Sequence, residues 1–90
     1  MSTILVSYDL NKPGKDYPKL WEHLRSYNAY AKPLESVWLV KTNLTALQVC
    51  DAAKKYVDQN DKIFTIDVTS RNAAWINLSK ENSDWIKEYL

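Results

Sequence analysis

Hydrophobic and polar positions follow two different periods along the chain, and the changes of period predict its elements. Residues Thr3–Leu10 alternate with a period of two, which is typical of a strand. Its two faces carry Ile4, Val6 and Tyr8 on one side and Leu5, Ser7 and Asp9 on the other. The turn-prone segment Asn11–Gly14 follows. A strand this apolar is expected in the middle of a sheet, because edge strands usually carry charges that discourage pairing.

Apolar residues recur every three or four positions in two later segments, which predicts two amphipathic helices. The first helix spans Tyr17–Tyr27, with Asp16 as its expected N-cap. His23 lies off its apolar stripe and is expected at the surface. The second helix spans Ala46–Val57 and opens with the capping box Thr45-x-x-Gln48. Cys50 lies on the apolar stripe of this second helix, which favours a core position over a reactive one.

The remaining segments predict further strands. Residues Tyr30–Leu34 indicate a short edge strand, because Pro33 cannot donate a hydrogen bond from a central position. Ser36–Lys41 is expected to be a buried strand, and Lys62–Thr69 another. Two more elements are expected at the C-terminus, a short strand over Ala73–Leu78 and a short helix that begins after Ser79.

This order of strands and helices predicts an α+β fold, the ferredoxin-like βαββαβ sandwich, with an extra C-terminal strand and short helix. We expect one domain over residues 1–90, with a core at about 3–69 and a C-terminal appendage at 70–90. In that topology the first strand lies between the third and fourth. Asp9 then lies near Ser36 and near the corner at Asp61–Lys62, while Asp67 lies toward the opposite end.

Composition narrows the classes of partner. Twelve Lys and Arg residues against eleven Asp and Glu residues leave a net charge of +1, which is not the clearly basic balance of most nucleic-acid-binding domains. Four Trp and six Tyr residues are more aromatic surface than a small core hides, so some are expected at a subunit interface. A single cysteine excludes a disulfide framework. No apolar run has the length of a membrane span, and no secretory signal pattern is present, so we expect a cytoplasmic protein without a membrane partner.

Asp9 is the unusual residue, an acid at the exit of an otherwise apolar strand. One interpretation is a turn role, in which its carboxylate accepts backbone N–H groups near Asn11. The other is a carboxylate for metal or phosphate chemistry at the end of a central strand. Asp is common in turns, and sequence physics alone favours the turn role.

Several segments resemble one family. The opening Ile4-Leu5-Val6-Ser7-Tyr8-Asp9-Leu10 is similar to the start of the small CRISPR-associated proteins that act as integration adaptors and metal-dependent nucleases. Ser36-Val37-Trp38-Leu39 resembles the Ser-Val-aromatic strand of that family, and Thr45 heads the second helix as in its layout. The resemblance spans roughly Thr3 to Thr69. The virulence-associated protein D toxins, and small bacterial proteins not linked to CRISPR arrays, share the superfamily.

The resemblance implies a homodimer in which Asp9 is both catalytic residue and metal ligand, one carboxylate coming from each subunit. The implied cofactor is Mg²⁺ or Mn²⁺, which would activate water for cleavage of RNA or DNA. Ser36 is the second implied catalytic residue, as a hydrogen-bond donor to a phosphate or water. The strand expected at Ala73–Leu78 would extend the sheet of the partner.

The chain also departs from the family. Val40-Lys41 stands where the family has Gly-Arg, and the arginine-rich first helix is missing. Lys12, Lys15 and Lys41 are the candidate residues for contacting nucleic acid, and Lys19 lies close to the first two in sequence. Ordinary solvated surface is the other interpretation of the lysines at positions 12, 15 and 19, and the prevalence of exposed lysine favours it. The sequence is compatible with two classes of function, of which a metal-dependent endonuclease that cleaves RNA or DNA is the first. The alternative is a non-catalytic interaction or regulatory module that uses its aromatic residues to bind another protein.

Overall fold

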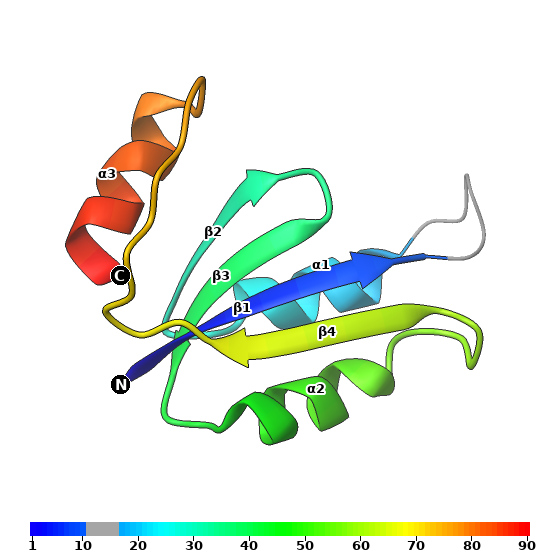
Figure 1. Ribbon diagram of the computed structural model, residues 1–90. Coiled ribbons are helices and arrows are strands. Elements are labelled where there is room, and N and C mark those ends of the chain that lie inside the picture. The colour runs from blue at the N-terminus through cyan, green and yellow to red at the C-terminus, as the bar shows by residue number, and fades with distance from the viewer. Residues whose placement is uncertain (11–16) are drawn as a thin grey trace.

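A computed structural model describes residues 1–10 and 17–90 of the chain (Figure 1). The predicted turn at Asn11–Gly14, the expected N-cap Asp16, and Lys12 and Lys15 lie outside the described residues. The elements are β1 (Ser2–Asp9), α1 (Pro18–Arg25), β2 (Ala29–Leu34), β3 (Val37–Thr42), α2 (Ala46–Lys54), β4 (Lys62–Asp67) and α3 (Lys80–Tyr89).

The four strands form one antiparallel sheet in the order β2-β3-β1-β4. The central position predicted for β1 is confirmed, and so is its place between β3 and β4. The edge position of β2 is also confirmed, and its pairing with β3 is irregular between Ala31 and Leu34, the stretch that contains Pro33. The chain is thus an α+β fold with a four-stranded antiparallel sheet and three helices, compatible with a ferredoxin-like arrangement.

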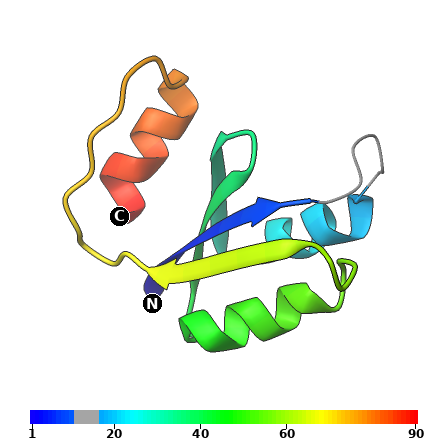
Figure 2. The same ribbon diagram turned by 45° about the vertical axis from the view of Figure 1, so that its right-hand side comes forward.

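The core lies between the sheet and the pair α1 and α2, which cover the same face (Figures 1 and 2). The strand residues Ile4 and Val6 are buried there against Leu20 and Leu24 of α1 and Val49 of α2. The face of β1 that carries Ile4, Val6 and Tyr8 is therefore the one that packs on the helices. Cys50 is half-buried beside this core.

The helices are shorter than the apolar stripes predicted. Helix α2 begins with the predicted capping box, in which Gln48 N–H donates to Thr45 Oγ1 at 3.1 Å and Thr45 N–H donates to Gln48 Oε1 at 2.9 Å. It ends at Lys54. Beyond this residue, Tyr56 N–H donates a hydrogen bond to the Ala53 carbonyl at 3.0 Å, three residues back, which tightens the last turn. Helix α1 has Tyr17 as its N-cap, with no side-chain cap bond.

The predicted strand over Ala73–Leu78 is wrong, because these residues form no strand. The chain leaves the β4 direction at Ser70, whose φ of 57° is in the left-handed region, and Asn77 has a φ of 62°. We call residues 70–79 the strap. It runs away from the sheet and returns through α3 (Figure 2), so it has no neighbouring strand to pair with. The predicted terminal helix is confirmed, and Ser79 caps it through Asn82 N–H at 3.1 Å.

Hydrogen bonds tie the C-terminus to the start of β1. Thr3 is fully buried, and its N–H donates to Thr69 Oγ1 at 2.9 Å while its hydroxyl donates to the Tyr89 carbonyl at 3.0 Å. Ser70 N–H donates to the Leu90 carbonyl at 2.9 Å. These bonds hold α3 on the sheet face opposite α1 and α2. In the part of the chain that the structure describes, no helix is long and apolar enough to cross a membrane.

Candidate functional site

The sheet face opposite α1 and α2 is called the open face, because α3 and the strap cover only part of it. By strand alternation and pairing it carries Leu5, Ser7 and Asp9 of β1, Val37 and Leu39 of β3, and Lys62, Phe64 and Ile66 of β4.

Asp9 is exposed at the exit of β1 on the open face. Its Cα partner across the sheet is Lys62, at the start of β4. Among the described residues no hydrogen bond or ion pair engages the Asp9 carboxylate. The turn interpretation involves Asn11, which lies outside the described residues. Within the described chain, the Asp9 carboxylate is therefore exposed and has no bonded partner.

Ser36 lies in the two-residue turn between β2 and β3, rather than at the start of a strand as predicted. It is exposed, and its carbonyl accepts the N–H of Tyr8 at 3.2 Å. This bond places the β2–β3 turn beside the end of β1, as the predicted topology required. Lys62 is the neighbour that sequence reasoning did not select. The predicted corner at Asp61–Lys62 was the available signal, because a base at the entry of β4 faces the exit of β1.

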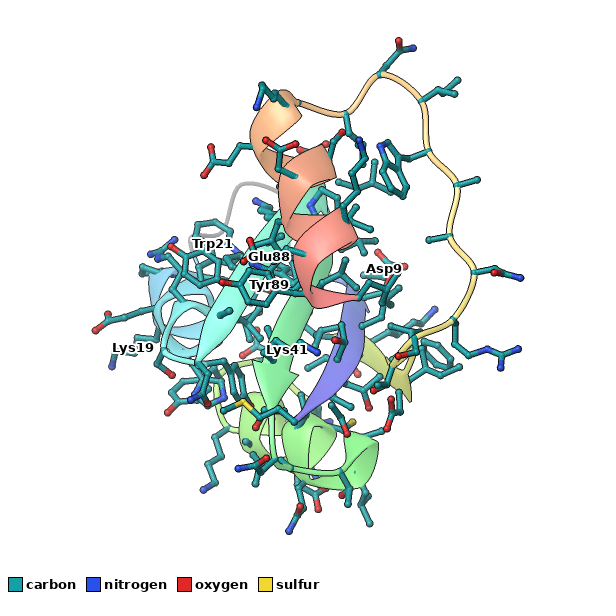
Figure 3. The ribbon with its side chains drawn as sticks, turned by 90° about the vertical axis from the view of Figure 1, so that its left-hand side faces the viewer. Asp9, Lys19, Trp21, Lys41, Glu88 and Tyr89 are labelled. Atoms are coloured by element: carbon teal, nitrogen blue, oxygen red, sulfur yellow. The ribbon has the colours of Figure 1, made fainter. Side chains whose placement is uncertain are left out.

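The structure does not bring Lys41 beside Asp9. Lys41 pairs with Thr3 at the opposite end of β1, six residue steps or roughly 20 Å away along the strand. It lies below Tyr89 of α3 (Figure 3). Lys19 is exposed on α1, on the other side of the sheet. Lys62 is thus the base that the described sheet places next to Asp9.

Asp9 offers a divalent metal one carboxylate at this end of the open face. Within the described residues no group of three or more His, Cys, Asp or Glu side chains is suitable for holding a metal ion. Mg²⁺ binds through one or two carboxylates together with waters and substrate phosphates. The donor set therefore suits such an ion only where a second Asp9, or the oxygens of a substrate, complete the site.

Two residues that carry the family resemblance, Tyr8 and Trp38, bond to each other. Tyr8 Oη accepts the indole N–H of Trp38 at 3.1 Å and that of Trp21 at 3.2 Å. Trp38 is 2% exposed. Lys32 Nζ lies 5.6 Å and 5.7 Å from the ring centroids of Trp21 and Trp38. This Tyr8 cluster joins α1, β1 and β3, so part of the resembling pattern has a packing explanation.

His23 is half-buried rather than on the open surface, which corrects the surface prediction. Its ring stacks on Tyr56 of the segment after α2, at 4.9 Å between centroids, and its Nε2 lies 3.3 Å from Tyr27 Oη. Burial between these rings, followed by the nearby charge of Lys55, lowers the pKa of His23 from its ordinary value of 6.5. The side chain of His23 thus connects α1 to the segment that follows α2.

This environment predicts a pH dependence of stability. In the unfolded chain His23 takes up its proton near its ordinary pKa, whereas the folded chain takes it up only at lower pH. Since the unfolded state binds more protons in this interval, we expect the free energy of unfolding to fall as the pH drops from about 8 to about 5. Urea titrations of the wild type and His23→Gln at several pH values test this prediction. An equal dependence of the free energy of unfolding on pH in both proteins would contradict it.

The pKa of the Asp67 carboxylate is lowered by hydrogen bonds from Thr69, so this group titrates at a lower pH than an ordinary aspartate.

The rest of the open face is apolar and partly uncovered. Phe64 is 60% exposed and Ile66 is 43% exposed, on neighbouring same-face positions of β4. Beside them a cavity of about 400 Å³ lies between the sheet, the strap and α3, with Leu5, Leu39 and Ile86 among its lining residues. Exposed apolar surface of this kind marks interaction sites in small proteins.

The free carboxylate of Asp9 and the apolar surface of β4 share one face of the sheet. No protein family model matches the chain, and no solved structure matches it significantly.

Proposed function

We propose that the protein is a homodimer that acts on nucleic acid as a divalent-metal-dependent endonuclease, with Asp9 as its metal ligand. The observation that carries the proposal is the exposed Asp9 carboxylate, which no described residue engages, at the end of the central strand. A carboxylate at this position contributes nothing to the packing of the core. The resemblance to the CRISPR-associated adaptor and nuclease family supports the same role.

The open face supports the dimer. A chain of 90 residues buries a smaller share of its surface than larger domains do, and association adds to that burial. Phe64 and Ile66 lie on the same face as Asp9, two and four residues along β4 from its partner Lys62. A two-fold axis through this end of the open face would pair the two Asp9 carboxylates. Two carboxylates and substrate oxygens meet the needs of Mg²⁺ or Mn²⁺.

Each residue near Asp9 has a chemical role in this proposal. Asp9 supplies a hard oxygen ligand, and the metal, when bound, lowers the pKa of a water and offsets charge on a phosphodiester. Lys62 contributes a positive charge next to Asp9, where a phosphate would lie. The exposed hydroxyl of Ser36, in the turn beside the end of β1, donates a hydrogen bond to a phosphate oxygen.

A cleavage assay tests the proposal. The purified protein is incubated with end-labelled RNA, single-stranded DNA and duplex DNA in Mg²⁺ or Mn²⁺, beside Asp9→Asn and an EDTA control. We expect cleavage that EDTA abolishes and that Asp9→Asn lowers at least about 100-fold, since a lost ligand removes the metal-dependent step. Asp51→Asn, on the exposed side of α2, is the matched control and is expected to retain activity. Cleavage by Asp9→Asn at the wild-type rate would contradict the proposal.

The second candidate is a non-catalytic module of the same fold that binds another protein. The uncovered apolar side chains of the open face favour it, because such a surface serves a partner protein as readily as a second copy. The same assay separates the two functions. A wild-type dimer that leaves all three substrates intact across several pH values, in either metal, would favour the module.

A further inference from the structure

A groove at the outer edge of β2 lies apart from Asp9 and from the apolar part of the open face. It has a volume of about 260 Å³ and is lined by Tyr30, Ala31 and Lys32 of β2 and by Glu81, Asn82 and Trp85 of α3. This volume is below the size of pockets that hold drug-sized ligands. The groove therefore suits a fragment the size of one planar ring system.

Two aromatic side chains from different elements border this groove. Tyr30 is 41% exposed and Trp85 is half-buried. Each ring is in contact with a second ring. Tyr30 packs on Trp38 at 5.9 Å between centroids, and Trp85 packs on Tyr89 at 4.9 Å. Side chains that are already packed in this way lose little conformational entropy when another ring stacks on them.

The polar groups of the groove match the edge of a nucleobase. Asn82 offers an amide, whose Nδ2 donates to the Lys32 carbonyl at 3.4 Å and whose Oδ1 has no bonded partner among the described residues. Glu81 offers a carboxylate that can accept from an exocyclic amino group. Lys32 adds a positive charge for a neighbouring phosphate, and its ammonium is already held near Trp21 and Trp38. Aromatic rings with an amide, a carboxylate and a lysine are the side chains that read unstacked bases.

We propose that the groove formed by Tyr30, Lys32, Glu81, Asn82 and Trp85 binds an unpaired base of a single-stranded nucleic acid. The inference rests on the proposed nucleic-acid partner and adds where the strand is held. The first turn of α3 contacts β2 here, and Asn82 occupies the Lys32 carbonyl, one of the edge groups that an added strand would use. An unpaired base enters such a groove, whereas a base stacked in a duplex does not.

Fluorescence anisotropy tests the inference without cleavage. Fluorescein-labelled single-stranded DNA and RNA of about ten nucleotides, a length within the range that small domains engage, are titrated in EDTA with the wild type and with Tyr30→Leu, Trp85→Leu and Trp85→Phe. We expect each leucine variant to bind about 10-fold more weakly or worse, and Trp85→Phe to recover most of the affinity, since stacking needs a ring rather than bulk. Tyr56→Leu is the matched control, because Tyr56 is 37% exposed and lies away from the groove. A labelled duplex is expected to bind less tightly than either single strand.

The outcomes are separable from those of the cleavage assay. In one outcome, the leucine variants bind single strands as tightly as the wild type while Asp9-dependent cleavage is intact. That result would contradict a base-binding role of the groove and would leave the proposed function unaffected. A wild type that binds neither single-stranded DNA nor single-stranded RNA would contradict both the base-binding role of the groove and the proposed nucleic-acid partner. Loss of affinity in Trp85→Leu that Trp85→Phe does not restore would assign Trp85 a packing role only, and would also overturn the inference.

Discussion

Replacing Tyr8 with phenylalanine is expected to lower the free energy of unfolding by about 2 to 3 kcal/mol. The phenylalanine keeps the ring but removes the oxygen that accepts the indole N–H groups of Trp38 and Trp21. Trp38 is buried, so its N–H would lose its partner without gaining water. Trp21 is half-buried and regains part of its bonding from solvent. Urea titration followed by far-ultraviolet circular dichroism measures the change.

Tyr27→Phe is the matched control for this prediction. Tyr27 Oη lies 3.3 Å from His23 Nε2, but the pair is only partly buried, and the imidazole can bind water instead. We expect this variant to lose less than about 1 kcal/mol, the net value of one exposed hydrogen bond. Equal losses in Tyr8→Phe and Tyr27→Phe would show that the Tyr8 cluster is not the link between α1, β1 and β3 described above.

Replacing Phe64 with glutamate is expected to raise the dissociation constant of the proposed dimer about 100-fold, or roughly 3 kcal/mol. Phe64 is the most exposed aromatic residue of the open face, and a carboxylate there would be buried without a partner at an apolar interface. The fold should survive, because the side chain is 60% exposed in the single chain. Sedimentation velocity over a range of protein concentrations measures the association.

Leu47→Glu separates a specific interface from a general effect of charge. Leu47 is 69% exposed on α2, on the side of the sheet away from the open face, and a glutamate in the first turn suits the helix dipole. We expect this variant to associate like the wild type. A dimer that Phe64→Glu leaves intact and Leu47→Glu dissociates would place the interface on the helical side.

The sheet and its order follow from signals that are local in the sequence. Three of these signals are the alternation of β1, the Pro33 that confines β2 to an edge, and the Thr45–Gln48 capping box. The structure contains the element that each of them predicts. Residues Ala73–Leu78 of the strap were predicted to form a strand. A strand needs a neighbour with free backbone groups, and the left-handed turn at Ser70 directs the chain away from β4. The amino-acid composition of a segment does not show whether such a neighbouring strand is available to it.

The site was only partly predictable for a similar reason. The topology places Asp9 beside the β2–β3 turn and Lys62 from the order of the strands alone. Lys41 lies near the end of β3, whose first residues lie beside the end of β1, so the antiparallel pairing of these two strands places it at the far end of β1 from Asp9. The position of His23 between Tyr27 and Tyr56 depends on how two helices meet, and the groove at Tyr30 and Trp85 depends on where α3 docks. Contacts between elements distant in sequence determine these positions.

The stoichiometry of Mn²⁺ binding tests the central claim most directly. Mn²⁺ is titrated into the wild type, Asp9→Asn and Phe64→Glu, and the free ion is followed by electron paramagnetic resonance. A site built from two Asp9 carboxylates predicts one Mn²⁺ for every two chains in the wild type, and weak or no binding in both variants. Asp51→Asn should bind like the wild type. Binding of one Mn²⁺ per chain that persists in Asp9→Asn would contradict the account, as would a wild type that takes up no Mn²⁺.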